Sequence, residues 1–210
     1  MKRFSFLNKK YEANEFIVML YRFAIVMALY SIGRIIFYLF NTSMFPNVDF
    51  SSFMRVMRGG VMFDTSAILY LNAIYFLLYL LPFPFKFKPW YQRMLKWIFM
   101  AFNGIGLTFN HIDIVYYRYI LKRTTASVFD IVSHDAGNFR LIMRFFYDFW
   151  YIPVILVITL ITLSKLYSLF KPRPSFNERS WKYAVLSVFA LIIFSALSVI
   201  GMRGDRKSVV

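Results

Sequence analysis

Six charged residues, lying in hydrophobic segments of this chain or close to their ends, have the chemistry to bind a phosphate group. Four are arginines, whose planar guanidinium groups can donate two parallel hydrogen bonds to phosphate. Two are aspartates that can hold such arginines in place. The sequence predicts either an ion-pair network that also receives an anionic lipid headgroup, or ordinary structural pairs that hold helix ends together. The six residues are Arg34, Arg58, Asp64, Asp113, Arg118 and Arg123.

Other groups with catalytic or metal-binding chemistry are sparse. The chain has no cysteine, which excludes disulfides and thiolate metal sites within it. His111 and His134 lie far apart in the sequence, without carboxylates at metal-ligand spacing, so no metal or other cofactor is expected in this chain. His111 is interpreted as an interfacial residue. The sequence has no phosphate-binding glycine loop and no nucleophile motif, so no catalytic residue is expected.

Five apolar segments, each long enough to cross a bilayer, position these charged residues. A spanning helix needs about 20 mostly apolar residues, and 60% of the chain is hydrophobic. Aromatic residues, which favour the headgroup level, gather near the segment ends. The predicted fold is therefore all-α, a polytopic membrane bundle. The five segments cover residues 16–40, 61–81, 94–117, 149–170 and 183–202.

The distribution of Lys and Arg predicts the orientation of the bundle. With the N-terminus inside, the inner segments carry more of these residues than the outer ones, which places the C-terminus outside the cytoplasmic membrane. The net charge of +15 is spread over every loop, which favours contact with anionic lipid over nucleic acid. Under this orientation the six charged residues lie near the outer leaflet. Arg22 lies near the inner end of the first segment, and we expect its side chain to snorkel to the headgroups.

Two further patterns concern helix packing. In residues 138–149, apolar residues recur at three- and four-residue spacing, which predicts an amphipathic helix on the outer leaflet; the alternative is an early extension of the fourth span. Small and polar residues also line the third span, and they predict close helix packing rather than a conduit. These are Asn103, Gly104, Gly106 and Asn110.

Three short segments resemble the N-terminal membrane region of lipoteichoic acid synthase-like proteins, which are sulfatase-type phosphoglycerol and phosphoethanolamine transferases. The first is Arg58–Asp64, followed by Leu69–Asn72. The second is Asn110–Tyr117, followed by Arg123–Thr125. The third is Gly201–Gly204, and together they extend the resemblance over nearly all of the chain.

The resemblance implies that the membrane helices and the catalytic domain have separate roles. Members of that family carry five membrane helices followed by an outer catalytic domain, which uses a threonine nucleophile and a divalent metal, typically manganese. Residues 1–204 would be the anchor, and residues 205–210 would begin the linker to a catalytic domain that this chain lacks. Thr124 and Thr125 match a membrane-region motif and are not expected to replace the nucleophile. The implied partners are membrane lipids, including anionic phospholipid, and that catalytic domain.

These 210 residues alone are therefore not expected to be an enzyme. Their expected role is to hold the catalytic domain at the leaflet and to present lipid headgroups to it. The alternative is a free-standing membrane scaffold or a small transporter subunit. A transporter predicts broken helices or polar residues near the midplane of several spans, whereas a scaffold predicts stable partner subunits and no lipid preference.

Overall fold

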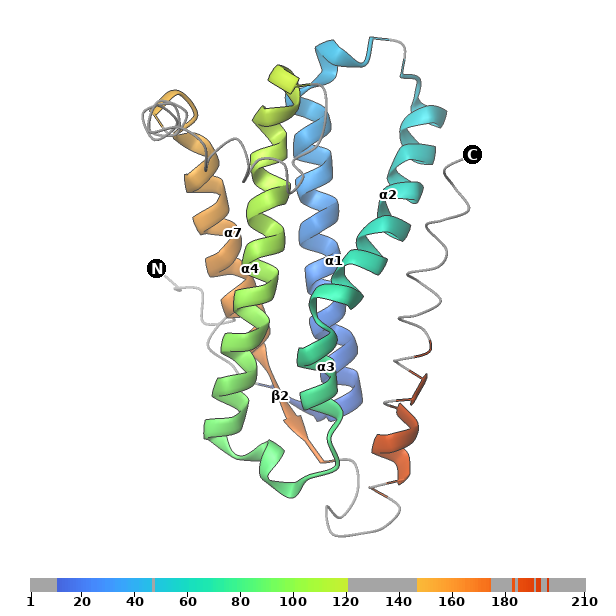
Figure 1. Ribbon diagram of the computed structural model, residues 1–210, viewed down its shortest axis with the longest axis vertical. Helices are drawn as coiled ribbons and strands as arrows, with labels where there is room; N and C mark the ends of the chain where they lie inside the picture. Colours follow the sequence, from blue (N-terminus) through green and yellow to red (C-terminus); the bar gives the residue numbers. More distant parts are fainter. Residues whose placement is uncertain are drawn as a thin grey trace, which may run out of the picture.

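The computed structural model describes residues 11–46, 48–120 and 147–174, together with residues 183, 185–190, 192, 193 and 196. These parts are mostly helical, and the long helices run side by side in a bundle (Figure 1). Helix α1 lies against α2, α4 and α7, and α4 lies against α2, α3 and α7 as well. The helices are α1 (Glu15–Phe40), α2 (Phe50–Leu71), α3 (Ala73–Leu80), α4 (Pro89–Ile120) and α7 (Tyr151–Leu169).

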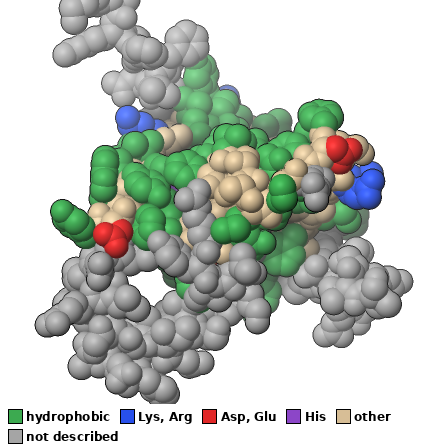
Figure 2. Space-filling view, turned by 90° about the horizontal axis from the view of Figure 1, so that it is seen from above, with side chains coloured by type: hydrophobic (Ala, Val, Ile, Leu, Met, Phe, Trp, Pro, Cys, Tyr) green, Lys and Arg blue, Asp and Glu red, His purple; other side chains and the backbone are tan. Residues whose placement is uncertain are grey.

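In the described part of the chain, three helices are long and apolar enough to cross a membrane. They are α1, residues Pro89–Tyr117 of α4, and α7; α2 and α3 together make a fourth candidate span. Large hydrophobic side chains lie on the outside of the bundle, for example Trp97, which is 71% exposed. Hydrophobic side chains also cover much of the described surface seen from above (Figure 2). The chain is therefore a multi-pass membrane protein, because water would disfavour so much exposed apolar surface.

Helices coincide with three of the predicted spans, and the helix of a fourth begins well before its predicted span. Helix α1 matches the predicted residues 16–40, α7 matches 149–170, and α4 contains 94–117 with extra turns at both ends. The helix of the second predicted span begins at Phe50, 11 residues before the predicted start of the span at residue 61. The fifth predicted span, 183–202, and the amphipathic helix, 138–149, fall largely outside the described residues.

Asp49 explains the early start of α2. Its carboxylate accepts a hydrogen bond from the Ser52 backbone N–H at 3.1 Å, which caps the first turn of the helix. Two hydrogen bonds from Ser52 lower the pKa of the Asp49 carboxyl below its ordinary value. The bond from the Ser52 side chain has the larger effect, and the bond from its backbone N–H has the smaller one. The residues from Phe50 onward are therefore helical before the predicted span begins at residue 61.

The second span is broken at Asn72, where α2 and α3 meet at a bend of 61°. Asn72 is fully buried, and its side-chain amide donates to the carbonyl of Ile68 at 3.0 Å. A side chain that competes for a backbone acceptor in this way weakens the regular helix ladder. The same amide donates to Asn103 Oδ1 on α4 at 3.0 Å, and Asn103 returns a hydrogen bond to Asn72 Oδ1 at 2.7 Å. The break is thereby fixed to the neighbouring helix.

A short sheet joins the two chain segments at one end of the bundle. Strand β1 (Tyr11–Asn14) precedes α1, and β2 (Phe170–Arg173) follows α7; the two pair in parallel. The prediction of an all-α fold is wrong in this detail, because neither strand is long or apolar enough to be recognised from a four-residue pattern. The sheet brings the start of α1 and the end of α7 to the same end of the molecule (Figure 1).

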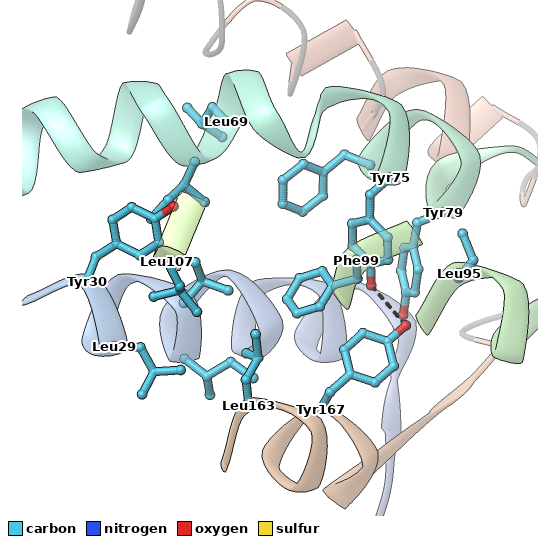
Figure 3. Packing of buried hydrophobic residues seen from close by; sticks show 14 of the residues in the cluster. Leu29, Tyr30, Leu69, Tyr75, Tyr79, Leu95, Phe99, Leu107, Leu163 and Tyr167 are labelled. Carbon is cyan, nitrogen blue, oxygen red and sulfur yellow. Dashed lines mark hydrogen bonds between the residues drawn. The ribbon is translucent and has the colours of Figure 1, made fainter. Parts of the chain in front are cut away.

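The core is rich in aromatic rings and lies between α1, α3, α4 and α7. Tyr75, Tyr79, Phe99 and Tyr167 gather at one end of it, while Leu107 packs toward the other (Figure 3). The ring centroids of Tyr75 and Phe99 are 4.9 Å apart, and so are those of Phe99 and Tyr167. Aromatic pairs at such distances stabilise packing beyond simple burial. The tyrosine hydroxyls inside this apolar core require polar partners.

Candidate functional site

Arg34 and Asp64 form an ion pair inside the bundle, between α1 and α2. Arg34 Nη2 donates to Asp64 Oδ1 at 2.6 Å and to the carbonyl of Gly60 at 3.1 Å. The two residues are only 8% and 3% exposed. Isolated charges at this depth would be very costly, so each residue compensates the other. The pair joins the first span to the second and is the part of the predicted charged set that the structure brings together most clearly.

Gly60 makes this contact possible. A Cβ atom at Gly60 would collide with the guanidinium group of Arg34, so a side chain there would displace the arginine. Gly60 lies one turn before Asp64 on α2, which puts its carbonyl and the carboxylate on the same face. The Gly60-x-x-x-Asp64 spacing therefore creates a cradle for one arginine of the neighbouring helix.

The third span meets α1 at the residue next to Arg34. A Cβ atom at Gly33 would collide with the side-chain oxygen of Asn110 on α4, so this pair of helices also packs closely. Farther along, Asn41 Nδ2 donates to the carbonyl of Ile114 at 2.9 Å. Together these contacts confirm that the small and polar residues of the third span serve close helix packing. They also bring Asn110 and Asp64 to adjacent residues of α1.

The other charged residues of the predicted set are distributed differently. Arg58 is exposed on α2, and Asp113 is half-buried on α4, where it interacts with other groups. Arg118 belongs to α4, but its side chain lies outside the described part of the structure, and so does the whole of Arg123. Of the six predicted residues, Arg34 and Asp64 thus form an ion pair in the described part of the structure.

Arg22 is a second buried arginine, and the prediction that it snorkels to the headgroups is wrong. It is 2% exposed, and its Nη1 donates to the hydroxyl of Tyr75 at 3.0 Å. Its guanidinium carbon lies 3.7 Å from the ring centroid of Tyr167 and 5.4 Å from that of Tyr79. The Tyr75 and Tyr167 hydroxyls are 3.5 Å apart (Figure 3). Aromatic faces attract the cation, which explains how it is held without a carboxylate among the described residues.

Arg22 and Tyr167 line a cavity that the sequence did not predict. The cavity has a volume of about 670 Å³ and lies between the first turns of α4, the end of α7 and β2. One edge is formed by the 3-10 turn Pro84–Phe87, which links α3 to α4. Lys96 Nζ donates to Ser168 Oγ at 2.8 Å across the cavity wall, which ties α4 to α7. The sequence did contain a signal for the polar surroundings of Arg22. Tyr75 and Tyr79 are one helical turn apart and therefore face the same side of their helix.

Glu15 and Lys86 form a second buried contact near the same end. Lys86 Nζ lies 3.7 Å from Glu15 Oε2, and the two side chains are 4% and 1% exposed. Tyr79 donates from its hydroxyl to the backbone carbonyl of Glu15 at 2.9 Å. Lys86 Nζ also lies 5.0 Å from the ring centroid of Tyr183. This contact connects the start of α1 to the turn before α4.

His111 has a structural position instead of the interfacial one that we predicted. It is 2% exposed, and its Nδ1 lies 2.7 Å from the carbonyl of Leu107. Its Nε2 lies 3.2 Å from Thr159 Oγ1, so the ring links α4 to α7. In the described part of the chain, no three His, Cys, Asp or Glu residues lie together in a way that could hold a metal ion.

Charged side chains thus mark both ends of the described bundle. At the end where α1 meets α2, the Arg34 guanidinium is paired with a carboxylate. At the end where β1 and β2 lie, Arg22 is held by tyrosines and lines a cavity. Comparisons with protein families, with curated proteins and with solved structures find no match to this chain.

Proposed function

We propose that this chain is the membrane anchor of a lipoteichoic acid synthase-like protein. In this role it holds an outer sulfatase-type catalytic domain at the membrane and presents anionic lipid headgroups to it. Tethering raises the local concentration of a surface substrate and restricts the orientation in which it meets the active site. The divalent metal of such a transferase, expected to be manganese, would belong to the catalytic domain and not to the anchor.

One observation supports the proposal most directly. Two of the segments that resemble the family, Arg58–Asp64 and Asn110–Tyr117, meet adjacent residues of α1. Asp64 pairs with Arg34 at 2.6 Å, and Asn110 packs against Gly33. Segments that are separate in the sequence would therefore act as one structural unit that locks three helices together. A rigid bundle is what an anchor requires, because a catalytic domain can be oriented only by a support that keeps its own shape.

The position of the lock bears on lipid presentation. With the N-terminus inside, Arg34 and Asp64 lie toward the outer leaflet, near the exposed Arg58. The buried pair would serve the structure, while exposed arginines such as Arg58 would contact headgroup phosphates. In this interpretation the six predicted residues have two roles instead of one shared role.

A small transporter subunit is the second candidate, and one observation favours it. The second span is broken at Asn72, and broken spans line the substrate sites of many transporters. At this break, however, the Asn72 backbone N–H donates to Ile68, and the Phe76 N–H donates to Asn72, both at 2.9 Å. The Asn72 side chain is occupied by Asn103. Polar groups that already bond to each other are poorly placed to coordinate a transported substrate.

The orientation on which the proposal depends has a direct test, since the chain contains no cysteine. Ser51→Cys and Lys88→Cys each introduce one thiol at an exposed position, one at each end of the bundle. A membrane-impermeant maleimide should label the Ser51→Cys variant in intact cells and the Lys88→Cys variant only after lysis. The reverse pattern would place the N-terminus outside and would exclude an outer catalytic domain after the last span.

The attached domain itself is tested by the size of the native product. An antibody against residues 41–58 should detect, in native membranes, a band much heavier than the 25.1 kDa of this chain. Protease added from the outside should shorten that product to a membrane-protected core. A band at 25.1 kDa would contradict the anchor proposal and would favour the scaffold or transporter alternative.

A further inference from the structure

The cavity beside Arg22 is lined by positively charged side chains. Its charged lining residues are all cations, and they come from three different elements of the fold: α1, α4 and β2. No acidic residue belongs to the lining that the structure describes. The backbone N–H groups at the start of α4 add positive potential at the same edge. The four cations are Arg22, Arg93, Lys96 and Lys171.

Arg22 is the most informative of these cations, because it is buried and its donors are not exhausted. Its Nη1 donates to Tyr75, but its Nε is buried and has no hydrogen-bond partner in the described structure. A buried cation with an unused donor is costly, and helix packing alone does not require it. An anion in the cavity would supply the missing charge.

Gln92 adds a complementary group to the lining. Its Nε2 donates to the carbonyl of Lys86 at 2.8 Å, which fixes the orientation of the amide. Its Oε1 is buried and has no hydrogen-bond partner among the described residues. Gln92 thus adds an uncharged amide of fixed orientation to the lining, and the charge of the lining comes from its cations.

The apolar lining indicates that the ligand is amphiphilic. On α4, Arg93 lies three and four residues before Lys96 and Trp97, and Met100 lies four and three residues after them, so the four share one side of the helix. The cations come first, and the apolar side chains lie farther from the start of the helix. Trp97 is 71% exposed toward the surroundings of the bundle. This order matches a lipid, with the headgroup at the membrane surface and the acyl chain along the protein.

We infer that this cavity binds the phosphate-bearing headgroup of an anionic lipid from the leaflet on the N-terminal side. Arg22 forms the inner wall, Arg93 and Lys96 contact the phosphate, and Trp97 lies along the acyl chain. Lys171 adds a further cation from β2, opposite Glu12 in the register of the sheet. The inference goes beyond the proposed function, since this cavity lies at the opposite end of the bundle from Arg34 and Asp64. It holds whether or not a catalytic domain is attached.

The experiment compares two variants that lose the same charge. Arg93→Gln with Lys96→Gln removes one arginine and one lysine from the cavity, whereas Lys165→Gln with Arg173→Gln removes one exposed lysine from α7 and one exposed arginine from β2, both outside the cavity lining. The purified full chain is titrated in detergent with phosphatidic acid, with phosphatidylcholine or with inorganic phosphate, and the bound species is measured by native mass spectrometry. Unfolding midpoints of all proteins are compared first.

The inference predicts that the cavity variant binds phosphatidic acid about thirtyfold more weakly than wild type, since two cations at a membrane surface are removed. The control variant with Lys165→Gln and Arg173→Gln should bind like wild type, and phosphatidylcholine should bind weakly to all three proteins. Equal binding by the two variants would overturn the inference. Displacement of the lipid by millimolar inorganic phosphate would overturn its lipid part and would identify a soluble phosphate instead. If the double cavity variant does not fold, Arg93→Gln alone should weaken binding about fivefold.

Discussion

Removing the carboxylate of Asp64 should destabilise the protein severely. In Asp64→Ala, the guanidinium group of Arg34 stays buried and keeps only the carbonyl of Gly60, at 3.1 Å, as an acceptor. Loss of one partner from a buried ion pair costs about 3–5 kcal/mol. The remaining hydrogen bond offsets about 1 kcal/mol of this. We therefore expect a loss of about 3 kcal/mol in the free energy of unfolding, which is about a hundredfold in the folded-to-unfolded ratio.

A double substitution separates the charge effect from the packing effect. Arg34→Met with Asp64→Leu removes both charges while it fills most of the space, so no uncompensated charge remains. Such replacements of a whole buried pair are often neutral or stabilising. The double variant should therefore unfold within about 1 kcal/mol of wild type, although it carries one substitution more than Asp64→Ala.

The assay is equilibrium unfolding of the purified chain in mixed micelles, with increasing sodium dodecyl sulfate and helicity measured by circular dichroism. Arg58→Ala, which removes an exposed charge from the same helix, is the matched control and should leave the midpoint unchanged. The reasoning is refuted if Asp64→Ala costs less than about 1 kcal/mol, or if the double variant is no more stable than Asp64→Ala.

Two other contacts yield predictions in the same assay. Asn103→Leu should lower the free energy of unfolding by about 1–3 kcal/mol, because it leaves the buried Oδ1 of Asn72 without a donor. Adding Asn72→Leu should recover part of that stability. A further loss of stability in the double variant would contradict the pairing. Gly106→Val should cost about 1–3 kcal/mol, since a Cβ there already collides with the Tyr30 hydroxyl. Gly104→Ala is its control, because the space beside Gly104 accepts a methyl group in ordinary contact; equal effects of the two changes would refute the packing argument.

The sequence predicted the membrane helices well, because their signal is local. An apolar run of about 20 residues contains its own evidence for a span, and α1 and α7 end close to the predicted residues. Close packing along the third span was also predictable, since small residues mark helix interfaces in membranes. Asn103 and Gly106 confirm this by their contacts with Asn72 and Tyr30.

What the sequence missed depends on contacts between distant residues. The break at Asn72 is held by Asn103, 31 residues away, and Arg22 is held by Tyr75, 53 residues away. A general preference of arginine for the headgroups favoured snorkelling, and only the folded arrangement of three tyrosines makes burial of Arg22 acceptable. The strands β1 and β2 depend on each other in the same way, because neither four-residue segment has a periodic signal of its own.

The two buried arginines of α1 show how this bundle treats its charges at each end. They are 12 positions apart on one helix, which is about 18 Å along its axis. Arg34 pairs with a carboxylate, so its surroundings are close to neutral. Arg22 is held by aromatic rings and hydroxyls, which stabilise a cation without cancelling its charge. The end of the bundle that contains Arg22 therefore stays positive. This difference in charge between the two ends favours the predicted inward orientation of the Arg22 end. The same positive potential attracts an anionic headgroup.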